Sequence, residues 1–358
     1  MNILDIIKVI VPATLSFFVG IAITPAITNF LYKHEMWKKK VKEVAVDGHG
    51  TPIFNKLHAH KEIGTPRLGG VVIWLSVFIV GVFIWTMSRF TDAGLFDKIE
   101  FVSRNQTWIP FWALLIGAMV GLVDDLLEIK GAGKRLAGGL SLKVRLAIIA
   151  FIGFTVGLWF FSKLGVTAIG LPFFGPLEVG ALLVPIYMLI MIAVYSGGVI
   201  DGLDGLSGGV FASIFAAYGI YAFSLGQFDL AAFCGLLIGG ILAFLWYNIP
   251  PARFYMSETG SMALTITVSI MAFMTDSLAD GVGIGILPIV GALLLGTAGS
   301  SLLQVLSKKF RGGKKIFLVA PIHHHFEAIG WPAYKVVMRY WIVSVVLAAL
   351  GLLVAFVG

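Results

Sequence analysis

Charged residues are scarce in this chain of 358 residues. Only 13% are Asp, Glu, Lys or Arg, whereas 58% are hydrophobic and the mean hydropathy is +0.96. A soluble protein of this length carries about 25% charged residues, so the composition excludes an ordinary soluble domain. Apolar runs of about twenty residues recur along the chain, and this is the length that a helix needs to cross a bilayer. The sequence therefore predicts an all-α, polytopic integral membrane protein.

Cysteine is almost absent as well. Cys234 is the only one, so the chain cannot form an intramolecular disulfide, and a metal site would have to use oxygen or imidazole ligands. The first apolar run is too long for the core of a cleavable signal peptide. No soluble domain interrupts the apolar runs, because the longest polar segment extends only from Lys33 to Arg67. Residues 1–358 are therefore expected to form a single transmembrane domain with its functional residues in loops.

The basic residues indicate how the chain crosses the membrane. Alternating loops between the expected spans form two sets, of which one carries 21 of the 26 Lys and Arg residues and the other carries 5. The positive-inside rule places the basic set in the cytoplasm and both termini outside. The net charge of +7 is thus a topology signal and does not indicate a nucleic-acid partner. We expect about ten spans, which start near Val9, Leu68, Trp108, Val144, Leu177, Gly209, Leu230, Gly260, Ile286 and Arg339.

Residues suited to chemistry share the basic side of the membrane. They are Asp124, Asp125, Asp201, Asp204, Glu258 and His323 to His325. Acids near the membrane plane are costly unless they are paired, hydrated or bound to a cation. Several of them on one face therefore indicate a divalent-metal site, whereas the acids of the outer loops are scattered.

Two aspartate motifs have a structural interpretation beside the functional one. In GLVDDLLEIK (residues 121–130), Asp124 and Asp125 point about 100° apart on a helix, so one could face a metal while the other orients a lysine or a substrate. The pair could also simply end a helix at the interface. In GGVIDGLDGLSGG (residues 197–209), the glycines permit close approach of a ligand, and Asp201 and Asp204 could accept hydrogen bonds from a nucleotide. The same residues could equally form a solvated turn.

A third motif, NIPPARFYMSETGSMALT (residues 248–265), leads from a short loop into a helix. Glu258 and Thr259 would lie near the helix N-terminus, where exposed N–H groups favour phosphate. Glu258 could ligate Mg²⁺, which prefers one or two carboxylates together with phosphate oxygens. Alternatively, Ser257 or Thr259 is an N-cap and Glu258 is a first-turn acid.

The fourth motif, APIHHHFEAIGW (residues 320–331), contains three adjacent histidines after the basic segment Lys308 to Lys315. Such histidines could bind a borderline metal, donate to phosphate or act as an acid or base near neutral pH. We expect phosphate contact, because the carboxylates favour Mg²⁺, which does not seek imidazole. The basic segment would also attract anionic lipid headgroups. Together the four motifs predict phosphoryl chemistry on a substrate that includes a lipid.

The order of these motifs resembles a known family. TPRLGG (residues 65–70), the Asp124–Asp125 pair, DGLDGL (residues 201–206) and APIHHHFEAIGW occur as in the bacterial phospho-N-acetylmuramoyl-pentapeptide transferases, which form a branch of the polyprenyl-phosphate N-acetylhexosamine-1-phosphate transferase superfamily. The resemblance implies Mg²⁺-dependent transfer of phospho-MurNAc-pentapeptide from UDP-MurNAc-pentapeptide to undecaprenyl phosphate. That reaction yields lipid I and UMP on the cytoplasmic face of the bacterial inner membrane, in peptidoglycan biosynthesis. A homodimer is one possible assembly.

The resemblance also implies roles for individual residues. It makes Asp124, Asp125, His323, His324 and His325 the catalytic residues, Asp201, Asp204, Asn248, Tyr255 and Lys134 the substrate-binding residues, and Glu258 and Asp125 the Mg²⁺ ligands.

Three positions depart from the family pattern. Where the family has FMGDVGS this chain has YMSETGS, so Glu258 replaces the metal-binding aspartate. The lead-in to DGLDGL lacks the usual asparagine and threonine. A lysine that commonly follows four residues after the first aspartate of the pair is Glu128 here. Another UDP-amino sugar as donor, a degenerate scaffold and a transporter are therefore the alternatives, although the clustered acids and the lack of a repeat disfavour a transporter.

Direct attack by the lipid phosphate is the expected mechanism. A two-step route through an aspartyl-phosphate is chemically allowed.

Overall fold

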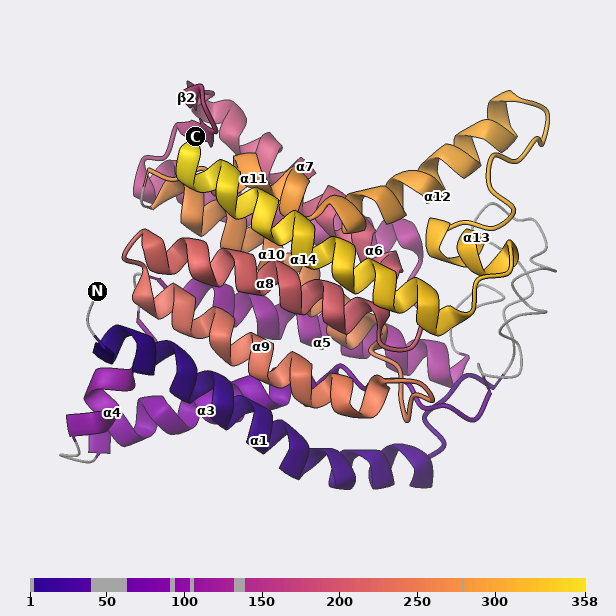
Figure 1. Cartoon of the computed structure of the whole chain (residues 1–358), viewed down its shortest axis with the longest axis horizontal. Helices are drawn as coiled ribbons and strands as arrows, with labels where there is room; N and C mark the ends of the chain where they lie inside the picture. Colours follow the sequence, from indigo (N-terminus) through magenta and orange to yellow (C-terminus); the bar gives the residue numbers. More distant parts are fainter. Residues whose placement is uncertain (1–2, 40–62, 91–93, 104–105, 132–138, 279) are drawn as a thin grey trace.

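The computed structural model describes residues 3–39, 63–90, 94–103, 106–131, 139–278 and 280–358, and they form a bundle of long helices (Figure 1). Two short antiparallel strands at one end of the bundle are the exception to this helical structure in the described part of the chain. The helices are α1 (Ile3–Lys33), α3 (Val71–Phe90), α4 (Gly94–Ile99), α5 (Trp108–Lys130), α6 (Leu142–Leu164), α7 (Leu183–Ser196), α8 (Leu206–Ser224), α9 (Phe228–Asn248), α10 (Ser257–Ser277), α11 (Gly283–Val290), α12 (Ala292–Phe310), α13 (Ile322–Ala328) and α14 (Ala333–Val357); the strands are β1 (Ala168–Leu171) and β2 (Gly175–Glu178), and 3-10 turns lie at Gly180–Leu182 and Gly197–Ile200.

The prediction of an all-α polytopic membrane protein is confirmed. Among the described residues, eight helices are long and apolar enough to cross a membrane, and the bent pair α11–α12 makes nine. The remaining expected span corresponds to α10, whose 21 residues give it a length of about 30 Å. The span expected near Leu177 begins instead at Gly180, because a turn with a positive φ at Gly175 folds residues 168–178 back into the β1–β2 hairpin.

Helix α10 forms the centre of the bundle, and almost all of its side chains are buried despite its many Ser and Thr residues. These hydroxyls donate to carbonyls one turn earlier in the same helix, as Thr265 does to Ser261 O at 2.7 Å and Thr267 does to Ala263 O at 2.7 Å. A polar side chain that is satisfied within its own helix can be buried at low cost, and its small size lets neighbouring helices approach closely.

Close packing of α5 on α10 depends on two glycines one turn apart. A Cβ on Gly117 would lie 3.0 Å from the Cα of Ala263, and a Cβ on Gly121 would lie 2.7 Å from the Cα of Thr259. The GAMVG segment therefore behaves as a small-xxx-small contact of the kind that joins membrane helices. As a result, the C-terminal end of α5, which carries Asp124 and Asp125, is pressed against the first turn of α10.

Helices α11 and α12 meet at an angle of 64°, so α12 leaves the bundle and projects from it (Figure 1). Its inner stripe of polar residues holds the chain that returns from its far end. Gln304 accepts from the backbone N–H groups of Ile316 and Phe317 at 3.0 Å each, and the Ser300 hydroxyl accepts from Ile322 N at 3.0 Å. These bonds fix where α13, the helix of the three histidines, begins.

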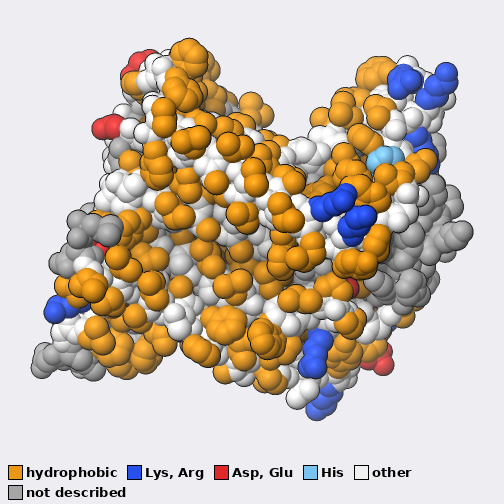
Figure 2. Space-filling view, viewed as in Figure 1, with side chains coloured by type: hydrophobic (Ala, Val, Ile, Leu, Met, Phe, Trp, Pro, Cys, Tyr) orange, Lys and Arg blue, Asp and Glu red, His pale blue; other side chains and the backbone are white. Residues whose placement is uncertain are grey.

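The two ends of the bundle differ in composition. Both termini lie at one end, whereas α13, the C-terminal end of α5 and the beginning of α8 lie at the other (Figure 1). Lys and Arg side chains gather mainly at the α12–α13 end, and a broad hydrophobic band separates it from the opposite end (Figure 2). This asymmetry agrees with the charge pattern of the loops, while the assignment of the basic end to the cytoplasm stays a prediction.

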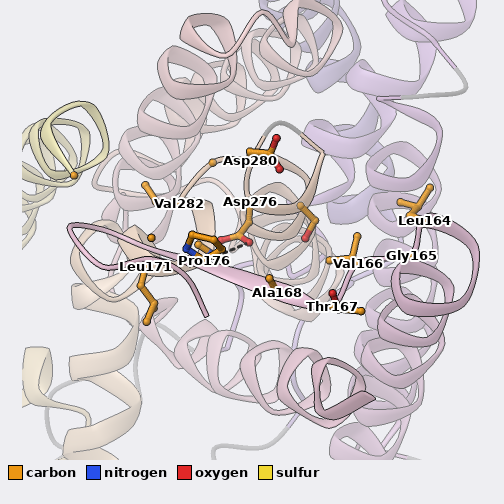
Figure 3. A pocket seen from close by; sticks show the side chains of 15 residues that line it. Leu164, Gly165, Val166, Thr167, Ala168, Leu171, Pro176, Asp276, Asp280 and Val282 are labelled. Carbon is orange, nitrogen blue, oxygen red and sulfur yellow. Dashed lines mark hydrogen bonds between the residues drawn. The ribbon is translucent and has the colours of Figure 1, made fainter. Parts of the chain in front are cut away.

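A cavity of about 470 Å³ lies at the end that carries the termini, between the β1–β2 hairpin and the C-terminal end of α10 (Figure 3). Asp276 points into it and holds its walls together, because its carboxylate accepts from Gly170 N at 3.1 Å and from Ile284 N at 3.1 Å. Both oxygens are thus committed to backbone groups of the hairpin and of α11. We interpret this acid as a structural link and not as part of a reaction site.

An Asp276→Ala variant is expected to unfold at a lower temperature, with a loss of about 2 kcal/mol, because two backbone N–H groups lose their acceptor. Thermal unfolding in detergent measures the loss. Asp280, on the same cavity wall and exposed, provides the control. Asp280→Asn removes the charge without either bond and keeps a residue type that tolerates the φ of +49° at this position. Equal stability of the two variants would contradict the structural role of Asp276.

Candidate functional site

The first turn of α10 is the meeting point of the predicted site residues. Asp125, fully buried at the end of α5, accepts from Glu258 N at 3.2 Å and from Thr259 N at 2.9 Å. These N–H groups have no partner inside their own helix, and a carboxylate there also interacts favourably with the helix dipole. Asp125 therefore caps α10 from another helix, in place of the cap that Ser257 or Thr259 could have supplied; no side-chain hydrogen bond forms at the N-cap itself.

Asp124 and Glu258 meet at one cationic group. Arg145, near the start of α6, places Nη1 3.5 Å from Oδ2 of Asp124 and in closer contact with Oε1 of Glu258. The other oxygen of Asp124 accepts from Leu140 N, and the Ser261 hydroxyl lies 3.5 Å from Oε2 of Glu258. Two carboxylates from distant motifs are thus joined at a single point by one guanidinium nitrogen.

The two aspartates of DGLDGL contact the loop that leads into α10. Asp201 accepts from the Ser207 hydroxyl at 2.7 Å and from Ser257 N at 2.9 Å, and Asp204 accepts from Ala252 N at 3.3 Å. Burial raises the pKa of Asp201 above its ordinary value, although its two hydrogen bonds counteract the shift in part. Ser257 itself has a φ of +58°, a conformation that costs non-glycine residues about 1–2 kcal/mol, so this junction is held by its contacts.

Asn248 and Tyr255 are tied to backbone groups. The buried Asn248 amide accepts from Gly205 N at 2.8 Å and donates to Phe254 O at 2.8 Å, which fastens the DGLDGL turn to the loop after α9. Tyr255 pairs through its backbone with the TPRLGG segment, from Tyr255 N to Pro66 O at 2.9 Å and from Gly69 N to Tyr255 O at 2.8 Å. The predicted substrate-binding residues therefore surround one junction, where they position its loops.

The histidine motif lies against the same turn. His323 and His324 are buried, and a Cβ on Gly202 would come within 2.7 Å of His324 Nε2 and still closer to His323 Nε2. On its other side, His324 Nδ1 lies 2.8 Å from Oε2 of Glu327, whereas His325 Nδ1 accepts from Leu318 N at 3.2 Å. Two imidazoles are thus directed at the aspartate turn, and the third stabilises the chain before α13.

Three basic side chains that the sequence motifs did not predict as site residues complete the site. Arg145 contacts Asp124 and Glu258; Arg67 contacts Asp125 and Glu128; Lys38 contacts Glu128. Arg67 stands inside the TPRLGG motif, but no spacing in the sequence shows which acid it meets. Lys134, predicted to bind substrate, lies outside the described residues.

The site combines carboxylates with the guanidinium groups of Arg67 and Arg145, so it offers partners to cations and to anions. In the part of the chain that the structure describes, no three His, Cys, Asp or Glu side chains form a ready-made metal cage. The predicted ligands Glu258 and Asp125 differ in their surroundings, because Glu258 shares a cation with Asp124, whereas both oxygens of Asp125 accept from α10. The role of Asp125 as a ligand stays a prediction.

Known proteins match both the site and the whole chain. Residues 107–276 match the family model described as Glycosyl transferase family 4. A phospho-N-acetylmuramoyl-pentapeptide-transferase from Phenylobacterium zucineum is 33% identical over 338 residues, which are 86% of this chain and 85% of the relative. Proteins of the same name from Rubrobacter xylanophilus (32% over 361 residues; 98% of this chain and 97% of the relative) and Desulfatibacillum aliphaticivorans (34% over 337 residues; 87% and 86%) are also similar. The family model covers the three acidic motifs, and the histidine motif follows it.

Proposed function

The chain belongs to the phospho-N-acetylmuramoyl-pentapeptide-transferase family, and on this premise we propose that it transfers phospho-MurNAc-pentapeptide from UDP-MurNAc-pentapeptide to undecaprenyl phosphate, forming lipid I and releasing UMP. It is a transferase and a multi-pass membrane protein, and we propose the cytoplasmic face of the bacterial inner membrane as its place of action. The observation that carries the proposal is that Asp125 and Asp201 both reach the first turn of α10, which carries Glu258, while two histidines lie against the turn that holds Asp201.

We propose Mg²⁺ as the cofactor of this site. Asp124 and Glu258 already meet at one cationic nitrogen of Arg145, so their oxygens are arranged around a point of positive charge. Two carboxylates, with the remaining positions filled by phosphate oxygens and water, are a common ligand set for Mg²⁺. These two residues would hold the ion, and bound Mg²⁺ would neutralise charge on the phosphate oxygens of the donor.

The protein groups around that point would bind and orient the diphosphate. Arg145 contributes a positive charge beside Asp124 and Glu258. His324 Nδ1 is held by Glu327, and Nε2 faces the aspartate turn, where it would contact a phosphate oxygen. Positioning and charge neutralisation of this kind supply most of the catalysis in phosphoryl transfer.

We propose direct attack of a lipid-phosphate oxygen on the sugar-bearing phosphorus, with the bond to the UMP oxygen breaking. Both oxygens of Asp125 accept hydrogen bonds from α10, which makes this carboxylate a poorer nucleophile for an aspartyl-phosphate route. Exchange of labelled UMP into the donor in the absence of lipid would instead support the two-step route.

The proposed reaction is tested with the purified protein in detergent, undecaprenyl phosphate, Mg²⁺ and radiolabelled UDP-MurNAc-pentapeptide. We expect a lipid-linked product and an equal amount of UMP, and we expect chelation of Mg²⁺ to stop both. UDP-N-acetylglucosamine serves as the competing donor. Product from that donor alone would assign the chain to another amino sugar, and no product from either would reject the proposal.

A Gly202→Ala variant is expected to slow this transfer by about 10- to 100-fold, because the added methyl group displaces His323 and His324 from the aspartate turn by a fraction of an ångström or more. The rate of lipid-product formation at saturating substrates is the measurement. Gly198→Ala is the matched control, since its nearest neighbour would be 3.6 Å away. Wild-type turnover in Gly202→Ala would show that the close contact with the imidazoles is irrelevant to the rate.

A further inference from the structure

Glu128 stands where the family commonly has a lysine, and it forms ion pairs with Arg67 and Lys38. Oε2 of Glu128 lies 3.0 Å from Nη2 of Arg67, and Oε1 lies 3.1 Å from Nζ of Lys38. The three side chains are 14–18% exposed, so the group is mostly shielded from water. An acid at this position therefore does not repel phosphate by itself, because it is neutralised by groups from other segments.

Arg67 is fixed at the centre of the acidic residues. Its backbone N–H donates to Met36 O at 2.7 Å, and the glycines that follow it pair with residues 255 and 256. Its Nε lies 3.7 Å from Oδ1 of Asp125, so the guanidinium spans Asp125 and Glu128. Burial would lower the pKa of Arg67, but the carboxylates of Glu128, Asp125, Asp201 and Glu258 together raise it. The positive charge of Arg67 therefore interacts with acids from three separate motifs.

The guanidinium of Arg67 keeps capacity for a further acceptor. Its Nε is buried and has no hydrogen-bond acceptor among the residues that the structure describes. A buried donor without an acceptor is costly. The side chain as a whole is still 18% exposed, so a ligand oxygen can approach the guanidinium from its accessible side. A planar guanidinium also matches phosphate better than an ammonium group does, because it presents several donors in one plane.

We propose that Arg67 is a phosphate-binding residue of this chain, which supplies positive charge from the TPRLGG segment beside Glu128, where the family commonly has a lysine. Its ligand is the diphosphate of the nucleotide-sugar donor. Glu128 is a positioning residue, which holds the guanidinium beside Asp125 and accounts for the lysine-to-glutamate change. This inference rests on the proposed function for the identity of the donor, and it assigns roles to Arg67 and Glu128, which were not among the predicted site residues.

The test removes the positive charge at residue 67 and places a positive charge at residue 128 instead, in the full-length protein. Arg67→Gln is expected to lower kcat/KM for the donor by about 100-fold, in the range found for one lost electrostatic contact to a reacting group. Glu128→Gln should cost less, since it frees Arg67 without removing it. In the double variant Arg67→Gln/Glu128→Lys, a lysine returns to α5, and we expect at least about tenfold recovery relative to Arg67→Gln, a non-additive effect typical of residues that act together.

Lys130→Gln is the matched control, because it removes one positive charge from the same helix end at an exposed position. Its kcat/KM should equal that of the wild type. A second measurement, titration calorimetry with UDP, separates binding from folding: Arg67→Gln should weaken UDP binding, and the double variant should restore it.

Two results would overturn the inference: wild-type UDP affinity and turnover in Arg67→Gln, or a double variant no better than that single variant. Failure of the proposed function is distinguishable, because the wild-type protein would then yield no lipid product from either donor, whereas the UDP titrations would still report on Arg67.

Discussion

A Glu258→Gln variant is expected to lose about 100- to 1,000-fold of the transfer rate, the effect of removing one group that stabilises charge at a reacting centre. The substitution preserves the shape of the side chain but removes its charge. It therefore breaks the ion pair with Arg145 and deletes one of the two carboxylates proposed to hold Mg²⁺. Initial rates of lipid-product formation over a range of Mg²⁺ concentrations provide the measurement. We also expect a higher Mg²⁺ concentration for half-maximal rate.

Glu258→Asp is the informative partner of this variant. It keeps the charge and restores the residue that the family usually has, but it shortens the side chain by one carbon–carbon bond of about 1.5 Å. The shorter carboxylate should lose its contact with Arg145 and retain a larger share of the rate than Glu258→Gln does. If both variants turned over like the wild type, Glu258 would have no part in metal binding or catalysis.

The second large effect is expected from Gly121→Ala, which should destabilise the protein by about 1–3 kcal/mol and abolish most of its activity. The added Cβ would lie 2.7 Å from the Cα of Thr259 and nearer still to the carbonyl of Glu258. Backbone atoms of a central helix cannot yield as a flexible side chain can, so α5 would have to move away from α10. Asp125 would then lose the N–H groups of Glu258 and Thr259. Thermal unfolding and the transfer rate measure the two consequences.

Gly296→Ala in α12 is the control for this variant, because its Cβ would meet nothing within 4 Å. Alanine also favours a helix over glycine by about 1 kcal/mol, so this substitution should be neutral or slightly stabilising. A Gly121→Ala protein as stable and active as Gly296→Ala would mean that close contact between α5 and α10 is not required for the site.

Local patterns predicted the spans well because hydropathy acts over a single helix. Nine of the ten expected starting points fall within a few residues of a helix start or inside one, and the tenth, Leu177, misses only because a hairpin comes first. The start of α10 was predicted near Gly260, three residues after its observed start at Ser257, from the apolar run that follows. Its capping partner was not: Asp125 is 132 residues earlier than Ser257, and sequence separation says nothing about which side chain reaches a helix end.

The cations illustrate the same limit. The sequence marks Asp124, Asp125 and Glu258 by the cost of acids near a membrane, but an arginine at a membrane surface is ordinary and gives no such signal. Only packing brought Arg145 to Glu258 and Arg67 to Glu128. Asn248 differs in the opposite direction. The sequence predicted that it binds the substrate, but in the structure its amide forms hydrogen bonds with two backbone groups of the protein itself.

The sequence by itself determined that this is an all-helical membrane protein whose aspartate motifs, Glu258 and histidine motif lie next to its basic loops. It could do so because span length, charge asymmetry and motif order are properties of neighbouring residues. The tertiary structure alone decided which of these groups meet. Ion pairs and helix caps form between segments far apart in the chain, at distances set by how closely α5, α8, α10 and α13 pack, and glycines such as Gly121 and Gly202 set that closeness.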